Sequence, residues 1–286
     1  MHKILAITKK EFYEHLKSKR LVIFGVIFGA IIPLTMGLTA YYTKGVSPND
    51  VLAGSHGLAT FFYVILGIAM AYDVIVREKK EKSLYTLLSK PISREEVVIG
   101  KFLGSLLSIC AIIIPVLIIG YLIAIAITHN TPSVADIGAV SSYLGIILLG
   151  IACYVGLAMA ISSAVRSSTT AILSAIGAWF GLGMIYSIVS LALMPQMLTP
   201  QVYADPTLMQ AKMEEINSLW YVKLAYAMNP GGCMDGAAYS VLGLKSLMGQ
   251  GLRYPLSTNS MIISLVIFLA VAIGITLGVF RSKDLT

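Results

Sequence analysis

Six long apolar runs dominate the chain, and each is bounded by polar or charged positions. A membrane-spanning helix needs about 20 apolar residues, because a rise of ~1.5 Å per residue must cover ~30 Å of hydrocarbon. The interiors of the runs carry no Asp, Glu, Lys, Arg or His, so we expect all six to be transmembrane helices with internally paired backbones. The runs are Leu21–Tyr42, Gly57–Tyr72 (or from about Leu52), Phe102–Thr128, Tyr143–Ala164, Ala171–Met194 and Ser260–Phe280.

The first twenty residues show a helical pattern of a different kind. Ile4, Leu5, Thr8, Phe12 and Leu16 fall near one helical face, with lysines between them. This pattern is typical of an amphipathic helix that lies in the membrane interface. We therefore predict an interfacial helix over residues 1–20.

The connection over residues 195–259 is long enough to have structure of its own. Asp205-Pro206 predicts a helix start, with the carboxylate as N-cap and proline at the first helical position. The Asn229-Pro230 turn is expected to break this helix, and a second helical segment is predicted near Met234–Met248. Three placements stay open: on the membrane surface, dipping back into the membrane, or capping a pathway.

Composition agrees with a single membrane domain over residues 1–286. The chain is 57% hydrophobic and 12% charged, with a mean hydropathy of +0.83, whereas soluble domains carry about 25% charged residues. The net charge of +7 gathers beside the apolar runs, where lysines and arginines meet anionic lipid headgroups. We therefore expect contact with membrane lipid and no binding to nucleic acid.

The distribution of positive charge also predicts the orientation. Most lysines and arginines lie before the first run and between the second and third runs, and short cytoplasmic loops are the positive ones. We predict a multi-pass protein of the cell membrane with both termini in the cytoplasm. The 195–259 connection would then be external.

Metal and disulfide chemistry are not indicated. Cys110, Cys153 and Cys233 show no paired spacing, and the histidines are not at ligand spacing from one another or from a carboxylate. We predict no metal site, with His56 and His129 not acting as ligands. The external acids, Asp235 among them, are interpreted as a solvated surface.

The segment over residues 73–101 is the most informative part of the chain. It holds a dense run of mixed charge and then Leu84, Leu87 and Leu88. The second and third leucines follow the first by three and four residues, so all three share one helical face. Pro91 ends this short helix, and Ser93 with Glu96 forms a capping box for the third span. A short helix with an apolar stripe is either resting on lipid or docking into a cytoplasmic partner. The residues predicted to act in coupling are Arg77, Glu78, Glu81, Leu84, Leu87, Leu88, Pro91, Ser93 and Arg94.

This segment resembles the coupling region of ABC-2-type transporter permeases. The matching residues are Glu78 to Glu81, Ser83-Leu84, Leu87-Leu88, Pro91, Ser93-Arg94 and Gly100-Lys101-Phe102, and Lys82-Ser83 departs from the usual Gly-Thr. The resemblance extends over the whole chain, and within the family it is nearest to the permeases of nitrous-oxide-reductase maturation transporters and of multidrug or sodium exporters. It implies an all-α membrane protein with six spans, an interfacial helix and a cytoplasmic coupling helix.

The resemblance also implies partners. These are a second permease subunit, as a homodimer or heterodimer, and ABC ATPase subunits that bind ATP and Mg. The chain itself has no Gly-x-x-x-x-Gly-Lys-[Ser/Thr] loop, since Gly100-Lys101 is followed by Phe102. We therefore expect no ATPase site and no cofactor in this chain.

Three other classes of protein compete with this hypothesis. An ion-coupled carrier usually buries an ionisable residue near the membrane midplane, a membrane enzyme needs clustered acids or histidines, and a scaffold needs neither.

Glycine pairs spaced four residues apart are candidates for close helix packing: Gly25 and Gly29, Gly177 and Gly181, Gly274 and Gly278. The candidates for a substrate pathway are Tyr121, Tyr154, Ser174 and Tyr186.

Overall fold

Helices make up the architecture of the computed structural model, which describes residues 2–43, 45–77, 93–193, 195, 199–243 and 254–282. Within these ranges the structure contains helices and no strand. The helices are α1 (His2–Leu16), α2 (Lys19–Tyr42), α3 (Pro48–Ala71), α6 (Arg94–Thr128), α7 (Val134–Ala164), α8 (Ser168–Leu193), α9 (Pro200–Ala204), α10 (Pro206–Ser218), α11 (Trp220–Ala227), α12 (Pro230–Val241) and α13 (Thr258–Ser282).

Six helices are long and apolar enough to cross a membrane: α2, α3, α6, α7, α8 and α13. They coincide with the six predicted runs, which confirms the all-α class and the six spans. All six begin before the apolar runs do, and α3, α6 and α7 begin about two turns earlier because polar residues form their first turns. Ser47, Ser93 and Ser133 each cap a helix with a capping box, completed by Asp50, Glu96 and Asp136.

The two most buried spans, α3 and α7, lie at the centre of the bundle. Helix α7 packs against α3, α12 and α13, while α6 packs against α1 and α2. Tyr63, Tyr143 and Tyr154 are among the largest fully buried side chains in a core that is otherwise mostly aliphatic. Helix α8 stands apart with little of its surface covered.

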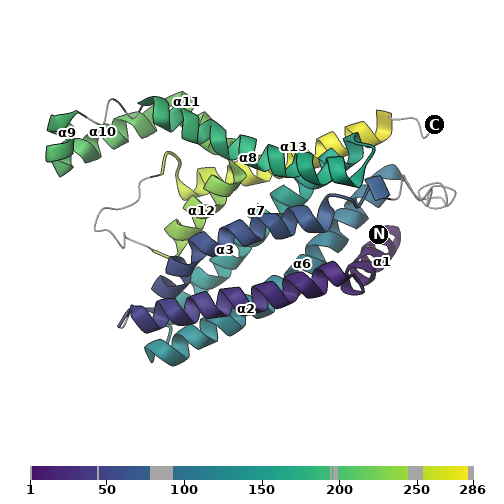
Figure 1. Cartoon of the computed structure of the whole chain (residues 1–286), viewed down its shortest axis with the longest axis horizontal. Coiled ribbons are helices and arrows are strands. Elements are labelled where there is room, and N and C mark those ends of the chain that lie inside the picture. Colours follow the sequence, from purple (N-terminus) through teal and green to yellow (C-terminus); the bar gives the residue numbers. More distant parts are fainter. Residues whose placement is uncertain are drawn as a thin grey trace.

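Both chain ends lie at the same end of the bundle (Figure 1). We call this the α1 end, because α1 and the last turn of α13 lie there. At the opposite end, which we call the α12 end, α12 packs among α3, α7 and α13. The helices α9 and α10 extend away from the bundle beyond α11 (Figure 1).

Candidate substrate pocket, polar cluster and coupling region

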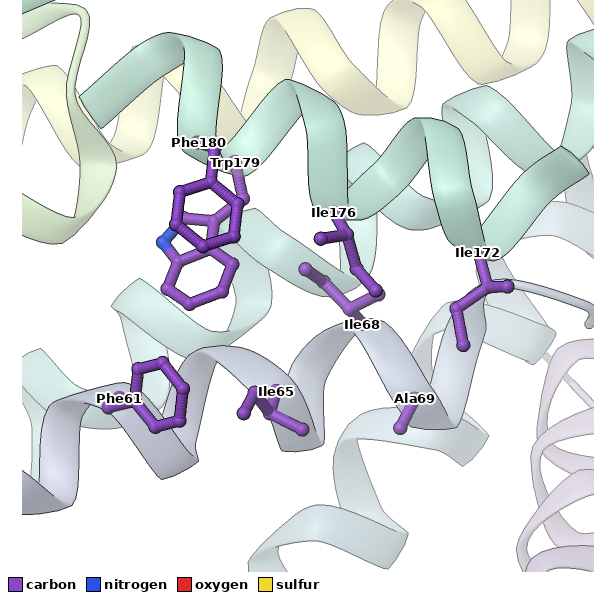
Figure 2. Close-up of a pocket in the computed structure, with 8 residues that line it drawn as sticks. All are labelled: Phe61, Ile65, Ile68, Ala69, Ile172, Ile176, Trp179 and Phe180. Atoms are coloured by element: carbon purple, nitrogen blue, oxygen red, sulfur yellow. The ribbon is translucent and has the colours of Figure 1, made fainter. Parts of the chain in front are cut away.

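An apolar pocket of about 270 Å³ lies between α3 and α8. The wall residues recur at helical spacing along both helices, so each helix turns one apolar face toward the other. The ring centroids of Phe61 and Trp179 are 5.5 Å apart, and those of Trp179 and Phe180 are 4.7 Å apart. The pocket is lined by Phe61, Ile65, Ile68, Ala69, Ile172, Ile176, Trp179 and Phe180 (Figure 2).

None of the wall residues is ionisable, and the indole nitrogen of Trp179 is the one polar side-chain atom among them. Ligand pockets are mostly apolar with a few polar groups that fix orientation. Aromatic rings gather at one end of the pocket and aliphatic side chains at the other (Figure 2). Chemically, the pocket suits a flat or bulky apolar group.

The four residues predicted to line a pathway are not among the residues that line this pocket. Tyr121 borders a second pocket of about 130 Å³ among α3, α6 and α7, and its hydroxyl donates to Asn49 Oδ1 at 2.8 Å. Tyr154 is buried in α7, the Tyr186 ring meets the Tyr226 ring edge-on at 5.0 Å, and Ser174 is exposed on α8. Their role in a pathway stays a prediction. The signal that sequence reasoning missed is the pairing of aromatic residues on two spans, Phe61 with Trp179 and Phe180.

A polar cluster adjoins the pocket at the α12 end. The His56 ring is fully buried, its Nδ1 lies 3.0 Å from the Tyr143 hydroxyl, and its Nε2 lies 3.1 Å from Asp235 Oδ1. The Asp235 oxygen accepts from the His56 ring, and the direction of the bond between Nδ1 and the Tyr143 hydroxyl depends on the tautomer of the ring. The Thr60 hydroxyl donates to the same Asp235 oxygen at 2.7 Å.

This cluster corrects two sequence interpretations. Asp235 is not simply part of a solvated surface, because it accepts hydrogen bonds from two residues of α3. His56 is not outside the spans, because α3 starts at Pro48 and therefore contains it. Helix α3 therefore carries an ionisable side chain, His56, within a span. The sequence had indicated that the spans contain none, which disfavoured an ion-coupled carrier.

Helix α12 reaches the cluster because its start lies deep in the bundle. Asn229 caps the helix by accepting from the Gly232 amide, and Pro230 occupies the first turn. The dipeptide separates α11 from α12, as predicted, and it also starts α12, four residues earlier than predicted. A methyl group at Gly231 would lie 2.9 Å from the Tyr154 hydroxyl, midway along α7, so only a residue without Cβ fits there. Helix α12 packs among α3, α7 and α13, and the placement of the connection relative to the membrane stays a prediction.

The coupling region is described at its two ends. Arg77, Ser93 and Arg94 lie in the described part of the chain, whereas Glu78, Glu81, Leu84, Leu87, Leu88 and Pro91 lie outside it. The Arg77 guanidinium is 3.6 Å from a Glu14 carboxylate oxygen of α1. Arg94 donates to the carbonyl of Phe280 at 2.9 Å and to that of Arg281 at 3.0 Å, and Arg281 pairs with Glu95. The coupling role of all nine residues stays a prediction.

The chain entering the coupling region is held by polar contacts. Arg20 donates to the buried Asp73 carboxylate at 2.8 Å. The amides of Ile75 and Val76 donate to Ser162 Oγ of α7 at 3.2 and 3.1 Å. Together with Arg77 and Arg94, these contacts tie the two ends of the coupling region to α1, α2, α7 and α13.

Helix α1 is present as predicted, and it packs on the bundle through Ile7, Thr8, Glu11 and His15, which are buried. Leu5 and Leu16 of the predicted apolar face are exposed, as a face toward lipid would be, and the interfacial placement stays a prediction. Lys101 Nζ of α6 lies 2.8 Å from Glu11 Oε2, and both side chains are at most 2% exposed. This long-range ion pair, which the sequence did not indicate, fixes α1 against α6.

Glycines of α6 permit this close approach. A Cβ at Gly100 would lie 2.7 Å from Ile7 Cβ, and one at Gly104 would lie 2.6 Å from Glu11 Cβ. The six glycines predicted for helix packing are placed differently: Gly25, Gly29, Gly177, Gly181, Gly274 and Gly278 have no atom within 4 Å of an added Cβ. They do not pack against another described helix of the same chain, and contact with a second subunit stays a prediction.

Among the described residues, no group of three His, Cys, Asp or Glu side chains could hold a metal ion. The three cysteines are not in disulfides, with Cys153 and Cys233 buried and Cys110 partly so. Bundle, pocket and polar cluster thus define a polytopic helical membrane protein with an apolar pocket between two spans.

Comparison with known families adds the particular class. A family model described as ABC-2 family transporter protein matches residues 5–285, and the chain belongs to this family. A probable ABC transporter permease protein NosY of Pseudomonas aeruginosa is 25% identical over 292 residues, covering 99% of both chains. A probable ABC transporter permease protein NosY of Stutzerimonas stutzeri is 26% identical over 223 residues, covering 72% of this chain and 79% of the relative.

Proposed function

We propose that the chain is the permease subunit of an ATP-driven exporter in the cell membrane, and that a separate ATPase chain binds ATP and Mg and hydrolyses ATP. The family membership and the names of the two relatives support this proposal. So does the absence of a phosphate-binding loop in the sequence. In this proposal the α1 end faces the cytoplasm, and a second permease subunit, identical or different, completes the transporter.

The observation that carries the transport role is the α3–α8 pocket. Its wall is apolar apart from one indole nitrogen, so it favours an apolar cargo, or an apolar part of one, over a bare ion. One side of the pocket belongs to a central, buried span and the other to the sparsely covered α8. A movement of α8 relative to α3 and α7, both of which it contacts, would therefore open or close the pocket.

Coupling to ATP hydrolysis is assigned to the segment between α3 and α6. The Leu84, Leu87 and Leu88 stripe inserts into the ATPase, with a rim of charged side chains around it, since apolar centres with polar rims concentrate binding energy. The rim comprises Arg77, Glu78, Glu81 and Arg94. The contacts of Arg77 with α1 and of Arg94 with α13 would pass a displacement of this segment to the bundle.

The test is a Leu87→Asp variant of the full chain, expressed with its ATPase. Burial of one leucine contributes about 1.5–3 kcal/mol, so co-purification is expected to weaken about tenfold or more. Substrate-stimulated hydrolysis should be lost in parallel. The matched control is Leu208→Asp on α10, an exposed leucine outside the spans, which should change neither measurement. Co-purification and stimulation that stay at parental levels in Leu87→Asp would show that the stripe is not the docking site.

A further inference from the structure

The α3–α8 pocket and the polar cluster are neighbours along α3. Phe61 lines the pocket, and the residue before it, Thr60, donates a hydrogen bond of 2.7 Å to Asp235. His56, one turn earlier on α3, binds the same carboxylate oxygen. Successive residues of a helix point about 100° apart, so Asp235 contacts the side of α3 that adjoins the aromatic end of the pocket.

The Asp235 carboxylate is accessible to a ligand. Its side chain is 36% exposed, although its partner His56 is fully buried. Its two hydrogen-bond donors, the Thr60 hydroxyl and the His56 ring, hold it in place, and neither is a permanently charged group like Lys or Arg. The donors engage Oδ1, and no hydrogen bond to Oδ2 is seen among the described residues. An oriented carboxylate with one oxygen engaged can still pair with an incoming positive charge.

The surroundings select the kind of cation. A metal ion needs several hard or nitrogen ligands, and no group of three suitable side chains occurs in the described part of the chain. Aromatic rings, by contrast, attract organic cations through their faces. Phe61 and Trp179 supply such rings at the near end of the pocket, and the Tyr239 ring packs on His56 with centroids 4.9 Å apart.

We propose that the α3–α8 pocket and Asp235 together form a binding site for an amphipathic organic cation, whose apolar body occupies the pocket and whose ammonium group pairs with the Asp235 carboxylate. This assignment rests on the proposed transport role of the pocket and adds the class of substrate to it. It also explains why α12 re-enters the bundle, since this helix carries the one carboxylate of the site to the end of an apolar wall.

The test uses two probes of the same shape, benzyltrimethylammonium and its uncharged isostere neopentylbenzene, in which carbon replaces nitrogen. Their binding to the full chain in phosphatidylcholine nanodiscs is measured by equilibrium dialysis, with empty nanodiscs subtracted. The parent chain should bind the cation more tightly than the isostere. Asp235→Asn keeps the Oδ1 acceptor for His56 and Thr60 but removes the charge, so it should bind the cation about tenfold more weakly and the isostere unchanged.

Three further variants separate this proposal from the transport role of the pocket. Trp179→Ala removes a pocket wall and should weaken both probes, whereas Trp220→Ala, an exposed tryptophan of α11, should weaken neither. Glu215→Gln, at an exposed carboxylate of α10, controls for loss of charge alone. Parental cation binding by Asp235→Asn overturns the cation assignment, whatever Trp179→Ala does. If Trp179→Ala binds both probes as tightly as the parent chain does, the pocket is not the binding site. A cation-selective loss in Asp235→Asn would then still support a role for the carboxylate in binding the cation.

Discussion

The two ends of the bundle each bring an acidic and a basic side chain together over a long sequence separation, yet with opposite character. At the α1 end, Glu11 and Lys101 are at most 2% exposed and lie 2.8 Å apart. At the α12 end, His56 is fully buried but Asp235 is 36% exposed. The first pair is closed to solvent and self-neutralising, whereas the second leaves a carboxylate accessible.

The difference follows from what surrounds each pair. Helix α1 packs closely on α6 at Gly100 and Gly104, and both side chains of the ion pair are buried there. Helix α12 meets α3 through side chains, and the aromatic end of a pocket lies beside the contact. The α1 end is thus suited to transmitting force between helices, and the α12 end to binding. Each prediction that follows tests one side of this contrast.

The largest effect is expected when one partner of the closed pair is removed. Lys101→Met leaves the Glu11 carboxylate buried without its cation, which typically costs about 3–5 kcal/mol. Thermal unfolding of the purified chain in detergent should show a strong loss of stability. The double variant Glu11→Gln/Lys101→Met should recover a large part of the loss, because no uncompensated charge remains. If Lys101→Met were as stable as the double variant or more stable, the description of Glu11 and Lys101 as a buried ion pair would be wrong.

The next effect concerns the close approach of the two helices. Gly104→Ala would place Cβ 2.6 Å from Glu11 Cβ and 3.0 Å from the Thr8 carbonyl, and such overpacking costs about 1–3 kcal/mol. The matched change Gly25→Ala meets no atom within 4 Å and replaces glycine in a helix, which contributes up to about 1 kcal/mol of stability. The two variants should shift the unfolding temperature in opposite directions. Equal shifts would mean that α1 does not pack on α6 at Gly104.

A smaller, pH-dependent effect is expected from His15, which lies beside the closed pair. Burial lowers the pKa of His15 below its ordinary value of 6.5; Arg77 and Lys101 lower it further, while Glu11 and Asp73 act in the opposite direction. The unfolded chain therefore takes up a proton at higher pH than the folded chain. Stability is complete above pH ~6.5 and decreases as the pH falls below it.

His15→Gln removes this titration, so the difference in stability between the variant and the parent should change between pH ~7 and pH ~5. Thermal unfolding at several pH values measures it, and the exposed His129 offers a matched control through His129→Gln. A constant difference for His15→Gln across this range would show that His15 titrates equally in both states.

The sequence predicted the spans well, since length and apolarity alone decide them. It predicted their starts less well, although the signal was present: Ser47 with Asp50 and Ser133 with Asp136 follow the same pattern as Ser93 with Glu96. Likewise Asn229-Pro230 has the pattern that identified Asp205-Pro206 as a helix start, and the two glycines after it favoured the interpretation as a break.

The contacts between distant segments could not be predicted. His56 and Asp235 are 179 residues apart, and Glu11 and Lys101 are 90 residues apart. Nothing in the local pattern of either segment indicates its partner, because such pairing depends on how helices pack. The inward side of α1 illustrates this: Glu11 and His15 are buried because Lys101 and Ser105 of α6 supply polar partners, and nothing in residues 1–20 indicates those partners.

The smallest effect on stability is expected at the open pair, and it is the one that separates a binding site from a structural clamp. Asp235→Asn retains an oxygen that accepts from His56 and Thr60, and the carboxylate charge it removes is partly exposed. The hydrogen bonds from His56 and Thr60 are retained and the lost charge was partly solvated, so thermal unfolding should change little. Asp235→Leu, by contrast, leaves both donors without their acceptor, at a cost of about 1–3 kcal/mol. If Asp235→Asn were as unstable as Lys101→Met, the Asp235 charge would be structural, and both ends of the bundle would be clamps of the same kind.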